Sequence, residues 1–224
     1  MKRLALLVVA IFTGVSAMSA VSLCPVATGS DTVFMSDLIA LNASGGCQSE
    51  DKIFSNFSYI VAAGGIQPTA VKAGLVLTRG TSSDIHGWLF APLVGNWTNP
   101  SSGFTIGYTI SISNPITSTW MIYASKDQIN TGLTPNGVAM HDVQSIGTIN
   151  TFGIGGSESS QLTYAGVNSV TTSSTATIPL GDELMSYEQD FFQRDTAVPE
   201  PVTMVLIGSG LLGLGFIRRR AKKS

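Results

Sequence analysis

The chain has 224 residues, of which 12% are charged, and its formal net charge at pH 7 is −2. Both ends are basic, whereas the region from Val21 to Thr196 holds five basic and thirteen acidic residues, a formal charge of −8. That sign argues against nucleic acid as a partner and against electrostatic docking on anionic polymers. The roughly 175 residues of this region are enough for one domain with a sizeable core.

Residues 1–20 are predicted to be a secretory signal peptide. A basic start is followed by a short apolar stretch over residues 4–15 and then by small residues, which is the layout of such a signal. We expect a signal helix here and cleavage between Ala17 and Ser22. Lipidation of Cys24 is the weaker alternative, because a bulky leucine precedes this cysteine where a small residue would be needed.

The chain has two cysteines, Cys24 and Cys47, and export favours a structural role for them. An oxidising compartment favours a disulfide between them, and in the chain-entropy model the closed loop of about 24 residues stabilises the fold by roughly 3 kcal/mol. Two free thiols or a metal pair are the alternatives. No nearby cluster of histidines or carboxylates supports the metal pair, and we expect no metal site and no cofactor.

Residues 21–185 are predicted to form one exported, mainly β domain, an antiparallel β-sandwich with a jelly-roll-like arrangement. Serine, threonine and glycine are abundant, and alternating or β-branched segments are separated by turn signals. One short helix is expected over residues 31–41, with Asp31 as its N-cap. The expected strands cover residues 53–62, 70–78, 85–94, 104–111, 119–124, 145–152, 162–170 and 176–179.

Residues 186–197 are expected to be a linker, and no catalytic residue is predicted. His86, beside Asp84, and His141, beside Asp142, are interpreted as solvated histidines, since serine is too common here for a Ser/His/Asp set to be informative. Two acidic pairs could in principle act as glycosidase carboxylates, but their position near the predicted linker favours solvated charge. These pairs are Asp182 with Glu183 and Glu188 with Asp190.

The tryptophans are the candidates for contact with sugar rings. Trp97 lies between Gly-Asn and Thr-Asn-Pro sequences, so an exposed loop position is expected and Trp97 is the first candidate for stacking on a ligand. Trp88 and Trp120 lie within apolar strand-like segments and are expected to fill the core.

The C-terminal region is predicted to hold a membrane span. Residues 202–217 contain no charged side chain, and a helix of this length would extend about 24 Å. The hydrocarbon core of a bilayer is roughly 30 Å thick, so the helix requires local thinning or snorkelling of its flanking side chains. The positive-inside rule places the tail 218–224 in the cytoplasm, and its basic residues are Arg218, Arg219, Arg220, Lys222 and Lys223.

A short proline-rich step precedes this span and consists of Val198, Pro199, Glu200 and Pro201. This step, the glycine-containing apolar run and the arginines together resemble the PEP-CTERM sorting signal of exported bacterial proteins, over residues 198–224. The resemblance implies recognition by an exosortase, a membrane peptidase, and an association with exopolysaccharide and biofilm matrix. Such tails are also labelled ice-binding-protein C-terminal domains, a label that transfers no activity to the domain in front.

Residues 46–59 also resemble a stretch that recurs near the start of exported proteins with this tail. The resemblance implies the first strand of a shared sandwich. The period of two would place Ile53, Phe57 and Tyr59 on one face.

The sequence therefore predicts an exported bacterial cell-surface or extracellular-matrix protein that is not an enzyme. Its expected partners are an exosortase-type peptidase, the inner membrane transiently and, as a further candidate, exopolysaccharide. The C-terminal helix would anchor the chain in the inner membrane before processing, after which the domain would be at the cell surface or outside the cell. A carbohydrate-binding module is the alternative, and an enzyme acting on polysaccharide is the third hypothesis.

Overall fold

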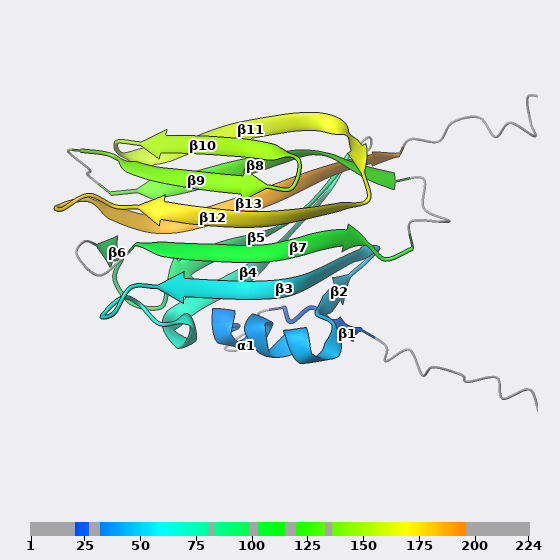
Figure 1. Ribbon diagram of the computed structural model, residues 1–224, viewed down its shortest axis with the longest axis horizontal. Helices are drawn as coiled ribbons and strands as arrows, with labels where there is room; N and C mark the ends of the chain where they lie inside the picture. Colours follow the sequence, from blue (N-terminus) through cyan, green and yellow to red (C-terminus); the bar gives the residue numbers. More distant parts are fainter. Residues whose placement is uncertain are drawn as a thin grey trace, which may run out of the picture.

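The computed structural model describes residues 21–26, 32–80, 83–98, 103–114, 120–132 and 136–195. The predicted signal peptide and the sorting region 198–224 lie outside these residues. Within them the chain is mainly β, with two sheets stacked face to face (Figure 1). The predicted β-sandwich is confirmed at this level.

The first sheet, called sheet 1 below, has seven strands. In spatial order they are β1 (Ser22–Leu23), β2 (Cys47–Ser49), β3 (Lys52–Val61), β7 (Phe104–Ile112), β12 (Ser169–Thr177), β9 (Val138–Gln144) and β10 (Gly147–Gly153). All neighbours are antiparallel except β1 and β2, which are parallel.

The second sheet, sheet 2, is antiparallel and has a five-strand path with a sixth short strand at its side. The path is β11 (Gly156–Val167), β8 (Trp120–Thr131), β13 (Glu183–Asp195), β5 (Asp84–Pro92) and β4 (Val71–Arg79), and β6 (Trp97–Thr98) pairs with the start of β13. Helix α1 (Met35–Ala40) and the short 3-10 helix η1 (Leu41–Ser44) contact β3, while η2 (Pro68–Ala70) leads into β4.

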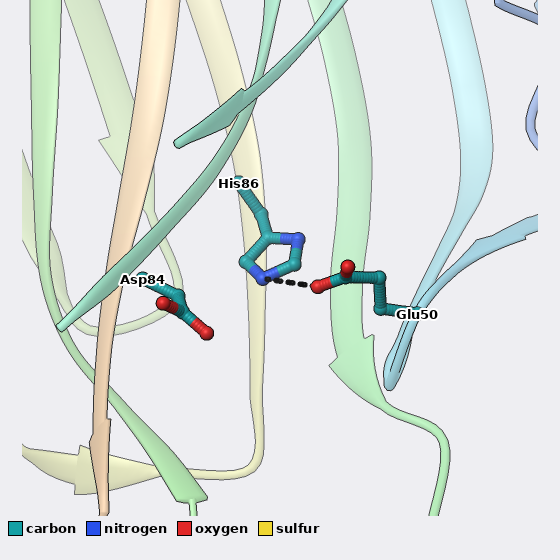
Figure 2. A group of neighbouring side chains, drawn as sticks. All are labelled: Glu50, Asp84 and His86. Carbon is teal, nitrogen blue, oxygen red and sulfur yellow. Dashed lines mark ion pairs between the residues drawn. The ribbon is translucent and has the colours of Figure 1, made fainter. Parts of the chain in front are cut away.

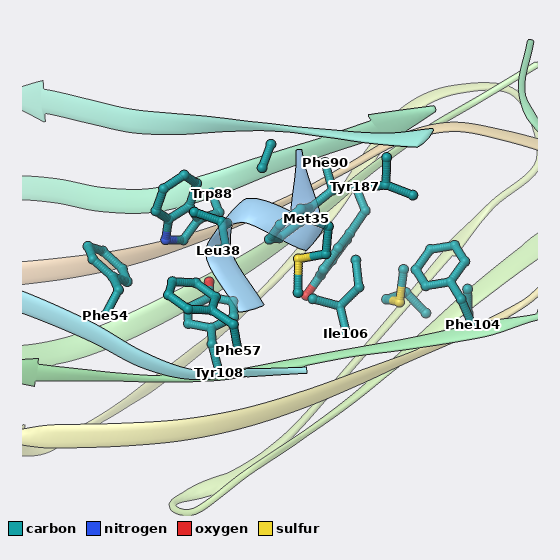
Figure 3. Close-up of a cluster of buried hydrophobic side chains, with 14 of the residues drawn as sticks. Met35, Leu38, Phe54, Phe57, Trp88, Phe90, Phe104, Ile106, Tyr108 and Tyr187 are labelled. Atoms are coloured by element: carbon teal, nitrogen blue, oxygen red, sulfur yellow. The ribbon is translucent and has the colours of Figure 1, made fainter. Parts of the chain in front are cut away.

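An aromatic core fills the space between the sheets (Figure 3). The Trp88 ring meets Phe54 and Phe57 edge-on, at centroid distances of 5.6 and 5.8 Å. Tyr108 stacks on Phe57 at 5.9 Å. Such contacts add to the stabilisation from apolar burial. Met35 and Leu38 of α1 are fully buried against this cluster, so the helix closes one side of the core.

The predicted disulfide is confirmed: Cys24 and Cys47 are bonded, with their Cα atoms 4.6 Å apart. Both residues are buried, and the bond links the segment after β1 to β2. The N–H of Cys24 also donates to the carbonyl of Gln48 at 2.8 Å. The N-terminal edge of sheet 1 is thus held both covalently and by backbone pairing.

Several predicted elements agree with the structure. The expected strands 53–62, 70–78, 85–94 and 104–111 correspond to β3, β4, β5 and β7. The expected helix corresponds to α1 with η1, but it begins at Met35 with Phe34 as its N-cap, so the N-cap predicted at Asp31 is wrong. The strand expected at 162–170 is wrong in extent, because β11 ends at Val167 and β12 begins at Ser169.

The linker predicted at 186–197 is wrong over residues 186–195. These residues belong to β13, which lies between β5 and β8 in sheet 2. Tyr187 and Gln189 are fully buried there. The domain therefore extends to Asp195, and its last strand is an interior strand of the sandwich.

The prediction that Ile53, Phe57 and Tyr59 share one face of β3 is also wrong. Phe54 and Phe57 are both buried although they are three residues apart. A register shift between Ser55 and Ser58 accounts for this, with the intervening Asn56 in the left-handed region at φ 56°. The extra residue of a bulge reverses the alternation of the strand.

Candidate functional site

A cleft of about 330 Å³ opens at one end of the sandwich. It is lined by Glu50, Asp51, Asp84, Trp120 and Gln193. Glu50 and Asp51 lie in the turn between β2 and β3. The other three residues belong to sheet 2: Asp84 to β5, Trp120 to β8 and Gln193 to β13. Both sheets therefore contribute to this cleft.

Three potential metal-ligating side chains meet at the cleft (Figure 2). Glu50 is exposed, Asp84 is half-buried and His86 is buried, and one donor atom from each lies within 4.8 Å of the others. The imidazole Nε2 of His86 is 3.9 Å from Oε2 of Glu50. Asp84 and His86 are two residues apart in β5, so strand alternation directs both to the same face.

Gln193 of β13 completes this group. Its Nε2 donates to Asp84 Oδ2 at 3.5 Å and lies 3.2 Å from His86 Nε2. With the amide in this orientation Nε2 can only donate, so His86 Nε2 accepts and the imidazole proton lies on Nδ1. Among the described residues, neither Gln193 Oε1 nor His86 Nδ1 has a hydrogen-bond partner.

Two cations flank the carboxylates of the cleft. Lys52 is only 1% exposed, and its Nζ lies 2.6 Å from Asp51 Oδ2. Burial lowers the pKa of Lys52, and the hydrogen bond and charge of Asp51 oppose this change. Arg79 is largely exposed and forms an ion pair with Glu50.

The surroundings of His86 lower the pKa of its imidazole. Burial lowers its pKa, the charge of Lys52 lowers it further, and the nearby carboxylates oppose both. Burial disfavours the charged imidazolium because a low-dielectric interior solvates it poorly. The interpretation of His86 as a solvated histidine is therefore wrong, since its side chain is buried at the wall of the cleft.

A separate polar network is buried between the sheets, beyond the aromatic core. Asp142 of β9 accepts hydrogen bonds from Gln144 Nε2 at 2.6 Å, Gln189 Nε2 at 2.7 Å and Ser174 Oγ at 2.9 Å, and also from Thr172. Buried carboxylates require such donors, because burial without hydrogen bonds is costly. These donors hold Asp142 in the interior, whereas its neighbour His141 is exposed.

Asp127 of β8 is the second carboxylate of this network. Its Oδ1 accepts from Gln189 Nε2 at 3.0 Å and lies 3.2 Å from the Tyr187 hydroxyl, whereas its Oδ2 has no partner among the described residues. Burial and the charge of Asp142 raise the pKa of Asp127 from its ordinary value of 3.8 to about 8. The network is therefore a pH-sensitive part of the core.

The structure does not support Trp97 as a stacking residue. Its side chain is fully buried, and the ring lies 4.5 Å from that of Phe104 between centroids. The expected loop position is wrong because β6 pairs with β13 and turns this ring into the core. Trp88 is buried as predicted, whereas Trp120 is half-buried and lines the cleft.

The acidic residues near the C-terminal strand lie in different surroundings. Asp182 is buried and accepts from the N–H of Asn136 at 3.3 Å, while Glu183 accepts from the side chain of Asn96 at 2.7 Å. Asp190 is buried with its Oδ2 3.1 Å from Lys126 Nζ. The interpretation of these groups as solvated charge is therefore wrong for Asp182 and Asp190.

His141 is the one predicted solvated histidine that the structure leaves exposed. It lies on β9, and its Nδ1 is 2.6 Å from Asn150 Oδ1 of the neighbouring strand β10. It lies outside the residues that line the cleft. Because it is exposed and outside the cleft, His141 is a suitable control for substitutions of His86.

The grouping of Glu50, Asp84 and His86 was not predicted from the sequence. The spacing of Asp84 and His86 in a predicted strand was a usable signal, because residues two apart share a face. Glu50 gave no such signal, since its approach to β5 depends on how the two sheets pack. Its backbone is in the left-handed region at φ 54°.

Comparisons with known proteins give a match to a short sorting motif and weak similarity to solved structures. No curated protein matches the chain. One similar solved structure is the family 11 carbohydrate-binding module from Clostridium thermocellum in complex with a β-1,3-1,4-mixed-linked tetrasaccharide, at 9% identity and a TM-score of 0.26. The similarity covers 64% of this chain and 90% of that chain, and a TM-score this low supports no inference about binding.

The predicted membrane span at about 202–217 lies outside the described residues. In the part of the chain that the structure describes, no helix has the length and apolar character needed to cross a bilayer. Residues 197–220 match the model of the PEP-CTERM protein-sorting motif. This chain therefore carries a PEP-CTERM sorting motif, which implies export to the cell surface and processing by an exosortase-type membrane system.

Proposed function

We propose that the chain is a non-enzymatic protein of the cell surface or extracellular matrix, anchored in the inner membrane until its C-terminal region is processed. The observation that carries this proposal is the sorting motif at residues 197–220, which begins two residues after β13 ends at Asp195. The disulfide between Cys24 and Cys47 supports the same compartment, because such bonds persist in oxidising environments.

The sorting proposal predicts that the Pro-Glu-Pro step is needed for processing. In a bacterium that contains an exosortase, the wild-type chain should appear outside the cell in a shortened form. A variant with Pro199→Ala, Glu200→Ala and Pro201→Ala should remain full-length in the membrane fraction. Fractionation followed by immunoblotting measures this difference.

Pro179→Ala provides the matched control, because this proline lies in the loop before β13 and outside the motif. Its processing should equal that of the wild type. Equal processing of the triple variant and the wild type would show that the motif does not direct sorting.

Carbohydrate binding in the cleft is the second candidate function. The observation that favours it is the combination of a half-buried indole, Trp120, with three carboxylates and the Gln193 amide around one opening. Indole faces stack on apolar faces of sugars, and a few convergent polar groups fix the orientation of a ligand. The candidate aromatic residue is therefore Trp120 in place of Trp97.

If the cleft binds a glycan, Trp120→Ala should abolish retention of the full chain on that glycan in affinity electrophoresis. Phe152→Ala is the control, because Phe152 is 59% exposed and lies outside the residues lining the cleft. Retention that survives Trp120→Ala would assign the binding to another surface, and the absence of retention on matrix polysaccharides would remove this second candidate.

A further inference from the structure

We propose that Glu50, Asp84 and His86 bind a divalent transition-metal ion of the Zn²⁺ class at the mouth of the cleft. This inference goes beyond the sorting and surface roles proposed above. It depends on the described domain alone, so neither export nor glycan binding is needed for it to hold.

The geometry is close to that of a three-ligand site. Zn²⁺ binds imidazole nitrogen and carboxylate oxygen at about 2.0–2.2 Å, which places tetrahedral ligand atoms about 3.4 Å apart. His86 Nε2 and Glu50 Oε2 are already 3.9 Å apart, and all three donor atoms lie within 4.8 Å of one another. Rotation of the Glu50 and Asp84 carboxylates about their side-chain bonds would bring these donor atoms closer together.

The buried side chains supply a second, independent observation. His86 is fully buried, and its Nε2 lies 3.2 Å from Gln193 Nε2 and 3.9 Å from Glu50 Oε2. In Figure 2 this nitrogen faces the carboxylate of Glu50. Gln193 is 3% exposed and lines the cleft, and its Oε1 has no hydrogen-bond partner among the described residues. A half-turn of this amide would direct an oxygen atom to the same point, giving a fourth donor.

The donor set selects the class of metal. One imidazole nitrogen with two or three oxygen atoms suits Zn²⁺ and its neighbours, whereas Ca²⁺ and Mg²⁺ take oxygen ligands. While Gln193 keeps its present orientation, the three protein ligands leave one tetrahedral position open, where a water molecule or an oxygen atom of an external ligand can bind.

Two features of the site fit a ligand role for Glu50. Its left-handed backbone, at φ 54°, is unfavourable for a residue other than glycine, and such strain is often found at functional sites. Its present partner, Arg79, is exposed, so this cation can leave the carboxylate when a metal binds. Arg79 and the metal ion would therefore compete for the same oxygen atoms.

The test is equilibrium dialysis of the full chain, purified in detergent, against ZnCl₂, with CaCl₂ and MgCl₂ in parallel. We expect one Zn²⁺ per chain and no comparable uptake of Ca²⁺ or Mg²⁺. His86→Gln should weaken Zn²⁺ binding by more than about tenfold, since even the loss of an outer-shell partner costs about that much. His141→Gln, which removes the exposed histidine, should leave binding unchanged.

Two further variants separate metal binding from folding. Glu50→Gly relieves the left-handed backbone, so the thermal midpoint without metal should be maintained while Zn²⁺ binding is lost. Arg79→Gln removes the competing cation, so Zn²⁺ should bind severalfold more tightly than to the wild type. Equal Zn²⁺ binding by the wild type, His86→Gln and Glu50→Gly, or no Zn²⁺ binding by the wild type, would overturn the proposal.

Discussion

The free energy of unfolding of the wild-type domain should fall as the pH rises from 4 to 8, and the substitution Asp127→Asn should remove most of this fall. In the folded chain the pKa of Asp127 is raised to about 8 by burial and by the charge of Asp142. The unfolded chain ionises near the ordinary value of 3.8, so the folded state binds the proton more tightly. The contribution of Asp127 is therefore fully present below pH 4 and is lost as the pH rises through about 8.

The size of this effect follows from linkage. Each unit of pKa difference corresponds to about 1.4 kcal/mol, so the whole difference amounts to on the order of 5 kcal/mol. Domains of this size have total stabilities of roughly 5–15 kcal/mol, which makes the effect large. Asparagine is nearly isosteric and cannot ionise, so the variant should gain stability relative to the wild type as the pH rises.

Urea unfolding at a series of pH values from 4 to 9 measures this difference. Glu158→Gln serves as the control, because Glu158 is an exposed carboxylate on β11. Its unfolding free energy should follow that of the wild type at every pH. If the unfolding free energies of Asp127→Asn and the wild type change in parallel with pH, then Asp127 ionises in the folded state at no cost in stability, which contradicts the prediction.

Loss of the disulfide should have the second-largest effect. Cys24 and Cys47 are 23 residues apart in sequence, and the cross-link restricts the unfolded chain. The chain-entropy model gives about 3 kcal/mol for a loop of this length. For a domain of this size, this corresponds to a decrease of roughly 6–12 °C in the midpoint of thermal unfolding.

A double variant, Cys24→Ser with Cys47→Ser, tests this by differential scanning calorimetry. Reduction of the wild type with dithiothreitol should lower its midpoint by a similar amount, whereas the double variant should not respond to the reductant. An unchanged midpoint in the double variant would mean that β1 and β2 hold this edge of sheet 1 without the bond.

Local sequence patterns were sufficient for much of the fold. Strands β3, β4, β5 and β7 have β-branched and aromatic residues between clear turn signals, and their bounds follow from these patterns. The disulfide followed from the compartment and from the presence of only two cysteines. The strand predictions rest on patterns within a short stretch of chain, whereas the disulfide prediction rests on the compartment and on the number of cysteines in the whole chain.

Strand β13 could not be predicted in this way. Its sequence carries acidic and amide side chains on both faces, a pattern typical of a solvated segment. In the structure the side-chain Nε2 of Gln189 lies within hydrogen-bond distance of Asp127, Asp142 and Thr172, which come from three other strands. Hydrogen bonds to other strands thus allow β13 to be buried despite its polar sequence pattern, and the periodicity of the sequence does not predict these bonds.

The candidate metal site was hidden for the same reason. Glu50 and Asp84 are distant in sequence, and only the packing of the β2–β3 turn against β5 brings their carboxylates together. Trp97 illustrates the converse case, in which loop-like neighbours surround a residue that the pairing of β6 with β13 buries.

The central claim, export and sorting through the C-terminal motif, is tested most directly by the intact mass of the protein recovered from outside the cell. We predict a chain that has lost residues up to the cleavage site between Ala17 and Ser22 and has lost the region that follows the motif's Pro-Glu-Pro step. Its mass should also be lower than that of the reduced chain by two hydrogen atoms, because of the Cys24–Cys47 bond. A strain without the exosortase should retain the C-terminal region, and the same unprocessed C-terminus in both strains would contradict the account.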